Sequence, residues 1–275
     1  MTYIRGKKTL ITGAARGMGR RMAEEFARRG AELLLVDIDE DELQLAVDDL
    51  AGHGVTVHSF VRDLSDREEI WELHKTVAEE VGRIDILVNN AGVVTGGTYE
   101  DIDADADQLM MDVNINAVHW MTKAFLPDLK QGADTHLVQL ASAAGLVGVP
   151  KQVIYCASKW FVTGFSEALR LELKGDGFDH VGISVICPGF VDTGMFDGAK
   201  PPMLMPMLQP EYVVDRIMDA VEEERFYVQE PLLVKLTPAL RALLPQPVVD
   251  TIMDVTGATS SMQGWKGRKK TEPTS

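Results

Sequence analysis

The stretch KTLITGAARGMG, residues 8–19, opens with a short apolar run and closes with a glycine-rich turn. The apolar run is typical of a buried strand, and a helical pattern follows it from Arg20 to Arg29. Gly13, Gly17 and Gly19 allow a tight turn and a close approach of the backbone to a ligand, while the amino end of the helix favours phosphate. The stretch therefore predicts a strand, a phosphate-binding turn and a helix.

The same alternation continues along the chain. We predict further strands at 31–37, 55–60, 83–90, 135–142 and 181–189, and further helices at 39–52, 66–81, 105–130 and 152–174. Strands separated by helices of about ten or more residues indicate parallel pairing. The sequence therefore predicts an α/β fold in which a single domain, residues 1–260, is built on a doubly wound parallel sheet.

Composition narrows the class of protein. The 275 residues are 45% hydrophobic and 25% charged, which suits one globular domain with a sizeable core. The net charge of −15 argues against a nucleic-acid partner, and two widely separated cysteines, Cys156 and Cys187, favour a reduced, cytoplasmic protein. No apolar stretch reaches the roughly 18 residues of a membrane span, the amino end lacks the apolar core of a signal peptide, and the histidines lack metal-ligand spacing. We therefore expect no membrane anchor and no metal.

Asp37 ends the second predicted strand, 18 residues after Gly19. This spacing is close to that expected for a carboxylate that binds the ribose of a dinucleotide. An ordinary glycine-rich turn followed by an exposed aspartate is the alternative interpretation. The two features together favour a dinucleotide site.

A second stretch, VIYCASKW at 153–160, places Tyr155 and Lys159 four residues apart. On a helix this is about one turn, or ~6 Å of rise, so the two residues share a face. A nearby ammonium group favours the phenolate form of a tyrosine, which otherwise titrates near ~10. A core-edge tyrosine beside a solvated lysine shows the same spacing, and the pair in isolation favours that interpretation over proton transfer.

Seven motifs follow one another along residues 7–195: TGAARGMG (12–19), DL (63–64), NNAG (89–92), VN (113–114), Ser142, YCASK (155–159) and PGFVDTGM (188–195). In this set and order the sequence resembles the short-chain dehydrogenase/reductase superfamily. The resemblance implies a Rossmann fold and an oxidoreductase that moves a hydride between a substrate carbon and nicotinamide C4.

The resemblance also implies the catalytic residues Asn114, Ser142, Tyr155 and Lys159. Tyr155 would exchange a proton with the substrate oxygen, and Lys159 would lower the pKa of Tyr155 and hold the nicotinamide ribose. Ser142 would orient and polarise the substrate oxygen. Asn114, rather than Asn116, would hold a water through its main chain and link Lys159 to solvent.

The cofactor-binding set follows from the same resemblance. Asp63 would bind the adenine, unless it only caps the turn after its strand, and Val191 and Thr193 would bind the nicotinamide carboxamide. The full set is Gly13, Arg16, Gly17, Met18, Gly19, Asp37, Asp63, Leu64, Asn90, Ala91, Gly92, Tyr155, Lys159, Pro188, Gly189, Val191 and Thr193.

Charge decides between NAD and NADP. A carboxylate at Asp37 accepts ribose hydroxyls but repels a 2′-phosphate, by ~4 kcal/mol for unit charges ~4 Å apart at an effective dielectric of 20. Arg16 favours NADP if its guanidinium contacts the 2′-phosphate. Alternatively, Arg16 forms an ion pair with Asp37. We predict that NAD is preferred and that NADP remains possible.

The predicted substrate is lipophilic: an alcohol of the steroid, retinoid or long-chain type, with its ketone or aldehyde. Residues 193–210 would form a methionine-rich lid, unless they only pack against the carboxyl-terminal helices. The only cations near this region are Lys151 and Lys200, so a charged substrate has no evident partner. The expected substrate residues are Ser142, Val149, Phe190, Met195, Phe196 and Met203.

The carboxyl-terminal part should form a helical extension. Apolar helices are expected at about 231–255, which could cover the substrate pocket, contact another subunit or lie on a membrane, although the acidic charge disfavours a membrane. Residues 261–275 should be a disordered polar tail. The end of the chain is similar to the retinol and 17β-hydroxysteroid members of the family.

Other functions and assemblies stay open. An NADPH-dependent 3-oxoacyl or general carbonyl reductase is the alternative enzyme, and a non-catalytic NAD(H)-sensing protein is the alternative class. A sensor has no chemical need for the whole set Asn114, Ser142, Tyr155 and Lys159. By resemblance we expect a homodimer or homotetramer built on helices 105–130 and 152–174.

Overall fold

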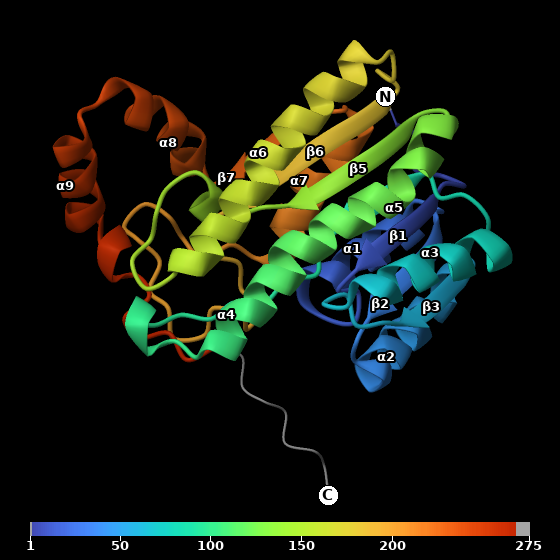
Figure 1. Ribbon diagram of the computed structural model, residues 1–275, viewed down its shortest axis with the longest axis horizontal. Helices are drawn as coiled ribbons and strands as arrows, with labels where there is room; N and C mark the ends of the chain where they lie inside the picture. Colours follow the sequence, from blue (N-terminus) through green and yellow to red (C-terminus); the bar gives the residue numbers. More distant parts are fainter. Residues whose placement is uncertain (1, 268–275) are drawn as a thin grey trace, which may run out of the picture.

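The computed structural model describes residues 2–267 and contains one parallel sheet (Figure 1). The sheet has seven strands in the order β3-β2-β1-β4-β5-β6-β7, so the chain winds outward in both directions from β1 and β4. Their bounds are β1 Lys8–Thr12, β2 Glu32–Asp37, β3 Val57–Val61, β4 Ile86–Asn89, β5 Thr135–Leu140, β6 Val181–Pro188 and β7 Tyr227–Glu230. The predicted doubly wound α/β fold is confirmed.

Helices cover both faces of the sheet because alternate strand residues point to opposite sides. Ile11 packs with α1, α2 and α7, whereas its neighbour Leu10 packs with α3, α5 and α6. The first group comprises α1 Gly17–Arg28, α2 Glu40–Leu50 and α7 Pro210–Glu222, and the second comprises α3 Arg67–Glu80, α5 Ala117–Gln131 and α6 Val153–Gly175. Each group closes an apolar core against the sheet.

Two predicted helices differ from the structure in ways that affect the site. Helix α1 begins at Gly17 rather than Arg20, so the end of the glycine turn is already the first helical turn. The predicted helix 105–130 consists of α4 Ala104–Met111, a π-helical turn Asp112–Asn116, and α5. Such π turns are frequent at functional sites.

Beyond the six predicted strands, α7 and β7 add one more unit to the sheet. β7 has the sequence YVQE and lies at the edge of the sheet, paired only with β6 among the described residues. A four-residue edge strand with two polar side chains carries no apolar run, which is why its sequence does not indicate a strand.

The carboxyl-terminal extension forms the predicted surface helices, α8 Leu232–Leu243 and α9 Gln246–Thr256, which project from one end of the sheet (Figure 1). Between residues 2 and 267, no helix has the length and apolar character needed to cross a membrane.

The expectation of a disordered tail from residue 261 is wrong for residues 261–267. Ser261 and Met262 are buried, and the Trp265 indole donates a 3.1 Å hydrogen bond to the carbonyl of Met195. The backbone N–H of Lys266 donates to the carbonyl of Asp197 at 2.8 Å. These apolar side chains and backbone bonds order the segment against the loop after β6. Residues 268–275 lie outside the described residues.

Candidate active site

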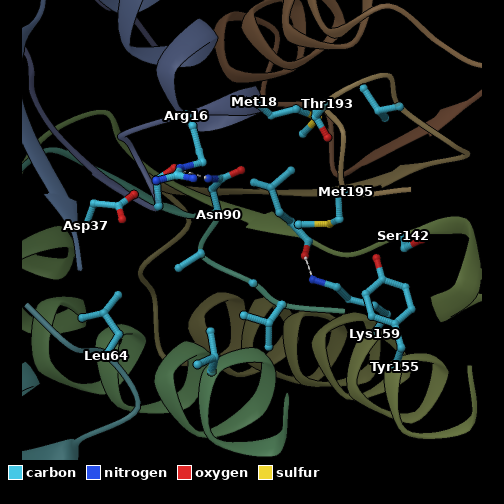
Figure 2. Close-up of a pocket in the computed structure, with 18 of the residues that line it drawn as sticks. Arg16, Met18, Asp37, Leu64, Asn90, Ser142, Tyr155, Lys159, Thr193 and Met195 are labelled. Atoms are coloured by element: carbon cyan, nitrogen blue, oxygen red, sulfur yellow. Dashed lines mark hydrogen bonds between the residues drawn. The ribbon is translucent and has the colours of Figure 1, made fainter. Parts of the chain in front are cut away.

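A cavity of about 500 Å³ lies at the carboxyl ends of the central strands (Figure 2). Asp37 and Leu64 lie at one end of it, and Ser142, Tyr155 and Lys159 lie together at the other. The predicted residues that line it are Gly13, Arg16, Gly17, Met18, Asp37, Asp63, Leu64, Asn90, Ala91, Gly92, Ser142, Tyr155, Lys159, Pro188, Gly189, Val191, Thr193, Met195 and Phe196. Gly19 and Asn114 do not line the cavity.

The glycine turn forms a backbone surface beside the cavity. Gly13 and Gly17 have φ angles of +64° and +57°, which favour glycine. A Cβ atom added to Gly19 would lie 1.9 Å from the carbonyl oxygen of Gly13, so Gly19 lets the first turn of α1 pack behind the loop. The N–H groups of that turn have no partner within the helix. The turn therefore fits a phosphate group of a dinucleotide.

Thr12 and Asn90 fix this turn to β4. The Asn90 amide donates to the carbonyl oxygens of Thr12 and Gly13 at 2.8 and 3.0 Å. The Thr12 hydroxyl accepts the backbone N–H groups of Asn90 and Ala91 at 2.9 and 3.0 Å. Thr12 was not among the predicted site residues, because a threonine at the end of a strand carries no signal of this role.

Asp37 faces the adenosine end of the predicted dinucleotide site. Its carboxylate accepts the backbone N–H of Ala15 at 2.9 Å and of Asp39 at 3.2 Å, which fixes its position. The alternative in which Arg16 pairs with Asp37 is wrong, because the Arg16 guanidinium forms its ion pair with Asp39. Asp39 is the N-cap of α2 and was missed by the sequence analysis.

Asp63 caps its own turn, since its carboxylate accepts the backbone N–H and hydroxyl of Ser65 at 2.9 and 2.7 Å. It also lines the cavity, so it does more than cap its turn, and its contact with adenine stays a prediction. Its neighbour Arg62 lines the cavity as well, which the sequence analysis did not predict. The site therefore has two cations, Arg16 and Arg62, near Asp37.

Helix α6 brings Tyr155 and Lys159 to the other end, next to Ser142 after β5. The Lys159 ammonium donates a 2.8 Å hydrogen bond to the carbonyl of Leu140 and lies 5.7 Å from the centre of the Tyr155 ring (Figure 2). All three side chains are buried. The predicted face of α6 therefore points into the cavity.

Burial controls the pKa values of this pair. It raises the pKa of Tyr155 to about 12, and a hydrogen bond with Ser142 opposes the rise. Burial lowers the pKa of Lys159 to about 8, because the ammonium form loses solvation. The sequence predicted that Lys159 lowers the pKa of Tyr155; in the structure Ser142 is the group that opposes the effect of burial.

Asn114 lies in the π-helical turn and is fully buried. Its amide accepts the backbone N–H of Val93 at 2.9 Å and donates to the Val93 carbonyl at 2.8 Å. Asn116 is exposed and donates to Asp112, which supports the choice of Asn114. A Cβ atom on Gly92 would lie 3.3 Å from the Asn114 amide oxygen and 3.7 Å from the Lys159 ammonium. The water relay through Asn114 stays a prediction.

A second cavity of about 320 Å³ adjoins the first and shares Ser142, Tyr155, Gly189 and Phe196 with it. The predicted substrate residues Val149 and Phe190 line this cavity, whose remaining walls come largely from the loop after β6 and from α8 and α9.

The prediction for Met203 is wrong. Its side chain is 57% exposed and lines neither cavity, because the loop is oriented by a 2.8 Å hydrogen bond from the Met203 N–H to the Thr256 carbonyl. Leu204 and Met205 line the second cavity instead. The loop thus lines the second cavity and also packs against the carboxyl-terminal segment, and its role as a lid stays a prediction.

The expectation that Lys151 and Lys200 are the cations near the substrate region is also wrong, because neither residue lines either cavity. Arg241 of α8 lines the second cavity, donates to the carbonyl of Leu146 and lies 4.7 Å from the centre of the Trp160 ring. The sequence could not indicate this contact, because it joins residues from distant segments of the chain.

Comparison with known proteins extends this description. A family model described as short chain dehydrogenase matches residues 7–203. The chain is 40% identical over 273 residues to epidermal retinol dehydrogenase 2 of Mus musculus, covering 97% of this chain and 87% of the relative. It is 38% identical over 244 residues to estradiol 17-beta-dehydrogenase 11 of Homo sapiens, covering 88% of this chain and 81% of the relative.

Two solved structures are similar to this one. A short chain dehydrogenase/reductase from Burkholderia phymatum in complex with NAD has a TM-score of 0.78 and 30% identity, with 100% of both chains covered. A short-chain dehydrogenase from Sphingobium yanoikuyae in complex with NADPH has a TM-score of 0.75 and 27% identity, covering 90% of this chain and 95% of the other. Both cofactors thus occur among similar structures.

Proposed function

Because the chain belongs to the short-chain dehydrogenase family, which acts on CH–OH donors with a nicotinamide cofactor, we propose that it interconverts a lipophilic alcohol and its ketone or aldehyde, preferably with NAD. One observation carries this proposal. The cavity that fits a dinucleotide and the cavity with mostly apolar walls meet at Ser142 and Tyr155. A substrate oxygen at this junction would contact both hydroxyl groups.

The residues of the first cavity would hold the cofactor along its whole length. The glycine turn would bind the pyrophosphate, Asp37 the adenosine ribose, Lys159 the nicotinamide ribose, and Val191 and Thr193 the carboxamide. When bound, the nicotinamide ring supplies the hydride acceptor or donor. The position of the glycine turn supports this placement, because Gly13 and Gly17 line the first cavity between its two ends.

Tyr155 would move the proton. With its pKa raised to about 12, its hydroxyl is protonated near neutral pH and can donate to a carbonyl oxygen. Acting as a base on an alcohol requires a lower pKa, which positive charge close to the ring would provide. Ser142 would hold the substrate oxygen, and Lys159, positioned by Leu140, would contribute its charge.

The apolar second cavity supports the lipophilic substrate class. The relatives named above are a retinol dehydrogenase and an estradiol 17-beta-dehydrogenase, whose names denote lipophilic alcohols. Burying apolar surface against Phe190, Met205 and α8–α9 would provide much of the affinity.

Two observations support a preference for NAD. The Asp37 carboxylate is held at the adenosine end of the cavity, and the guanidinium of Arg16 is already paired with Asp39 rather than free to bind a 2′-phosphate. A second candidate is NADPH-dependent carbonyl reduction. It is favoured by Arg62, a second cation beside the same end of the cavity. A non-catalytic NAD(H) sensor would have no use for Ser142, Tyr155 and Lys159 together.

The test is a fluorescence titration of purified protein with NADH and with NADPH, followed by initial rates with NAD and a panel of hydrophobic alcohols. We expect tighter NADH binding and NADH formation from the alcohols. Tighter NADPH binding with ketone reduction would replace this proposal by the second candidate. Saturable turnover of small hydroxy acids alone, with none of hydrophobic alcohols, would contradict the substrate class.

A further inference from the structure

The second cavity has few polar side chains, and nearly all of them have partners within the protein. The Thr237, Thr256 and Ser261 hydroxyls donate to carbonyl oxygens of their own segments, the Ser142 hydroxyl accepts the N–H of Ala144, and Arg241 donates to Leu146. Tyr155 is hydrogen-bonded to Ser142. These groups therefore need no ligand to satisfy them.

Gln152 is the exception. It lines the second cavity, is 2% exposed, and its amide nitrogen is buried without a hydrogen-bond partner among the residues that the structure describes. Its backbone is fixed, because its N–H donates to the Val149 carbonyl at 3.3 Å and its carbonyl accepts the Cys156 N–H at 2.8 Å. An unpaired buried amide is costly, and each such group in a folded protein calls for a partner.

The position of Gln152 relates this amide to the reacting group. It immediately precedes α6 and stands three residues before Tyr155. Gln152 and Tyr155 both line the second cavity, and one turn of α6, a rise of about 4.5 Å, separates them. A ligand atom bound by Gln152 would therefore lie within a few bonds of the carbon that reacts at Tyr155.

From this geometry we propose that Gln152 binds a second oxygen of the substrate. The substrate is then a lipophilic alcohol that carries a further hydroxyl or oxo group a few carbons from the reacting carbon. This inference rests on the proposed function and narrows its substrate class. A site with a buried amide discriminates against analogues that lack the matching oxygen, because the amide is then left unpaired. Arg241 is a weaker candidate for this role, since Leu146 and Trp160 already hold its guanidinium.

The experiment compares decan-2-ol with decane-2,5-diol and decane-2,6-diol as substrates of the full chain with NAD. We expect the wild-type kcat/KM for the better diol to exceed that for decan-2-ol by about tenfold or more, as one hydrogen bond to a buried group allows. In Gln152→Leu and in Gln152→Met, which is closer in shape, this ratio should fall to about one. Gln44→Leu, the same change on the exposed face of α2, should leave the ratio unaltered.

A ratio that is unchanged in both Gln152 variants would overturn the proposal. That result would also be expected if a water were the partner of Gln152, or if the residue had only a structural role, because both substrates would then be affected equally. A wild-type enzyme without preference for either diol would overturn it as well.

Failure of the proposed function would look different: NADH would bind, but no alcohol would be oxidised. The Gln152 proposal would then be decided by the melting temperature of the NADH complex. The proposal requires that a diol raises the melting temperature of the wild-type NADH complex more than decan-2-ol does. In Gln152→Met this difference between the two ligands should be lost.

Discussion

The ammonium group of Lys159 donates its hydrogen bond to the carbonyl of Leu140, at the end of β5. The lysine is thereby held by the sheet rather than by its helical neighbour Tyr155. Because it is buried, its pKa falls to about 8, so its charge is sensitive to mildly alkaline conditions.

Lys159 should make cofactor affinity depend on pH. Below a pH of about 8 the group is an ammonium ion that can bind ribose hydroxyls, and above it the neutral amine predominates. We expect the Kd of NADH, measured by fluorescence, to rise as the pH increases beyond this value. In Lys159→Arg the rise should be absent, because guanidinium stays charged. Parallel profiles for both proteins would contradict the assignment.

Tyr155 should affect chemistry rather than cofactor binding. Removing its hydroxyl in Tyr155→Phe eliminates the proton donor, and we expect kcat to fall by roughly 10²–10⁴-fold. The Kd of NADH should change little, because the ring remains. Initial rates and an NADH titration on the same preparation provide the check. A variant that keeps more than half of the wild-type kcat would exclude Tyr155 as the acid/base.

Asp37 should determine cofactor choice. In Asp37→Ser the charge that repels a 2′-phosphate is lost, while Arg16 and Arg62 remain. We expect the ratio of NADPH to NADH affinity to rise by about tenfold or more, a change of about 1.4 kcal/mol, well within the ~4 kcal/mol repulsion of a close charge pair. Asp41→Ser, on the exposed first turn of α2, is the matched control. An equal change in both variants would indicate a general charge effect instead.

His136 should make the fold sensitive to acid. It is fully buried, bonded to the Ser184 hydroxyl at 2.9 Å, and burial lowers its pKa to about 3 from 6.5. Between about pH 3 and pH 6.5 the imidazole of His136 is therefore protonated in the unfolded chain and neutral in the folded chain. This contribution to stability is fully present above pH 6.5 and is lost as the pH falls toward 3.

Denaturant unfolding at pH 7.5 and pH 5 measures this effect. At pH 5 the wild type should have lost about 2 kcal/mol more of its unfolding free energy than His136→Gln, which has no such group to protonate. His53→Gln, at an exposed position, should follow the wild type. Equal losses in wild type and His136→Gln would show that carboxylates alone cause the acid sensitivity.

The sequence was most informative where local chemistry determines the backbone. The glycine turn followed by Asp37 and the four-residue spacing of Tyr155 and Lys159 predicted the two ends of the first cavity. Apolar runs predicted β1, β2, β4, β5 and β6, because these strands are largely buried. The strand at β3 was also predicted, although only Phe60 of its residues is buried. The pattern could not indicate β7, because its four residues, YVQE, contain no apolar run.

Side-chain partners in loops and between distant segments were least predictable. Met203 and Met205 have the same chemistry and similar surroundings in the sequence, and only the bond to Thr256 shows which of them reaches the cavity. Arg16 had two acidic neighbours within reach, and the structure selects Asp39. The expected homodimer or homotetramer stays a prediction.

The two cavities draw on different parts of the chain. The dinucleotide cavity is lined by residues between Gly13 and Phe196, whereas much of the wall of the second cavity comes from residues after Glu230, beyond the last strand. If the second cavity binds the substrate as proposed, we expect mutations in α8 and α9 to change the range of accepted alcohols without altering the residues around Tyr155 and Lys159. In evolutionary terms, sequence changes confined to the extension would alter the walls of the second cavity and leave the residues that line the first cavity unchanged.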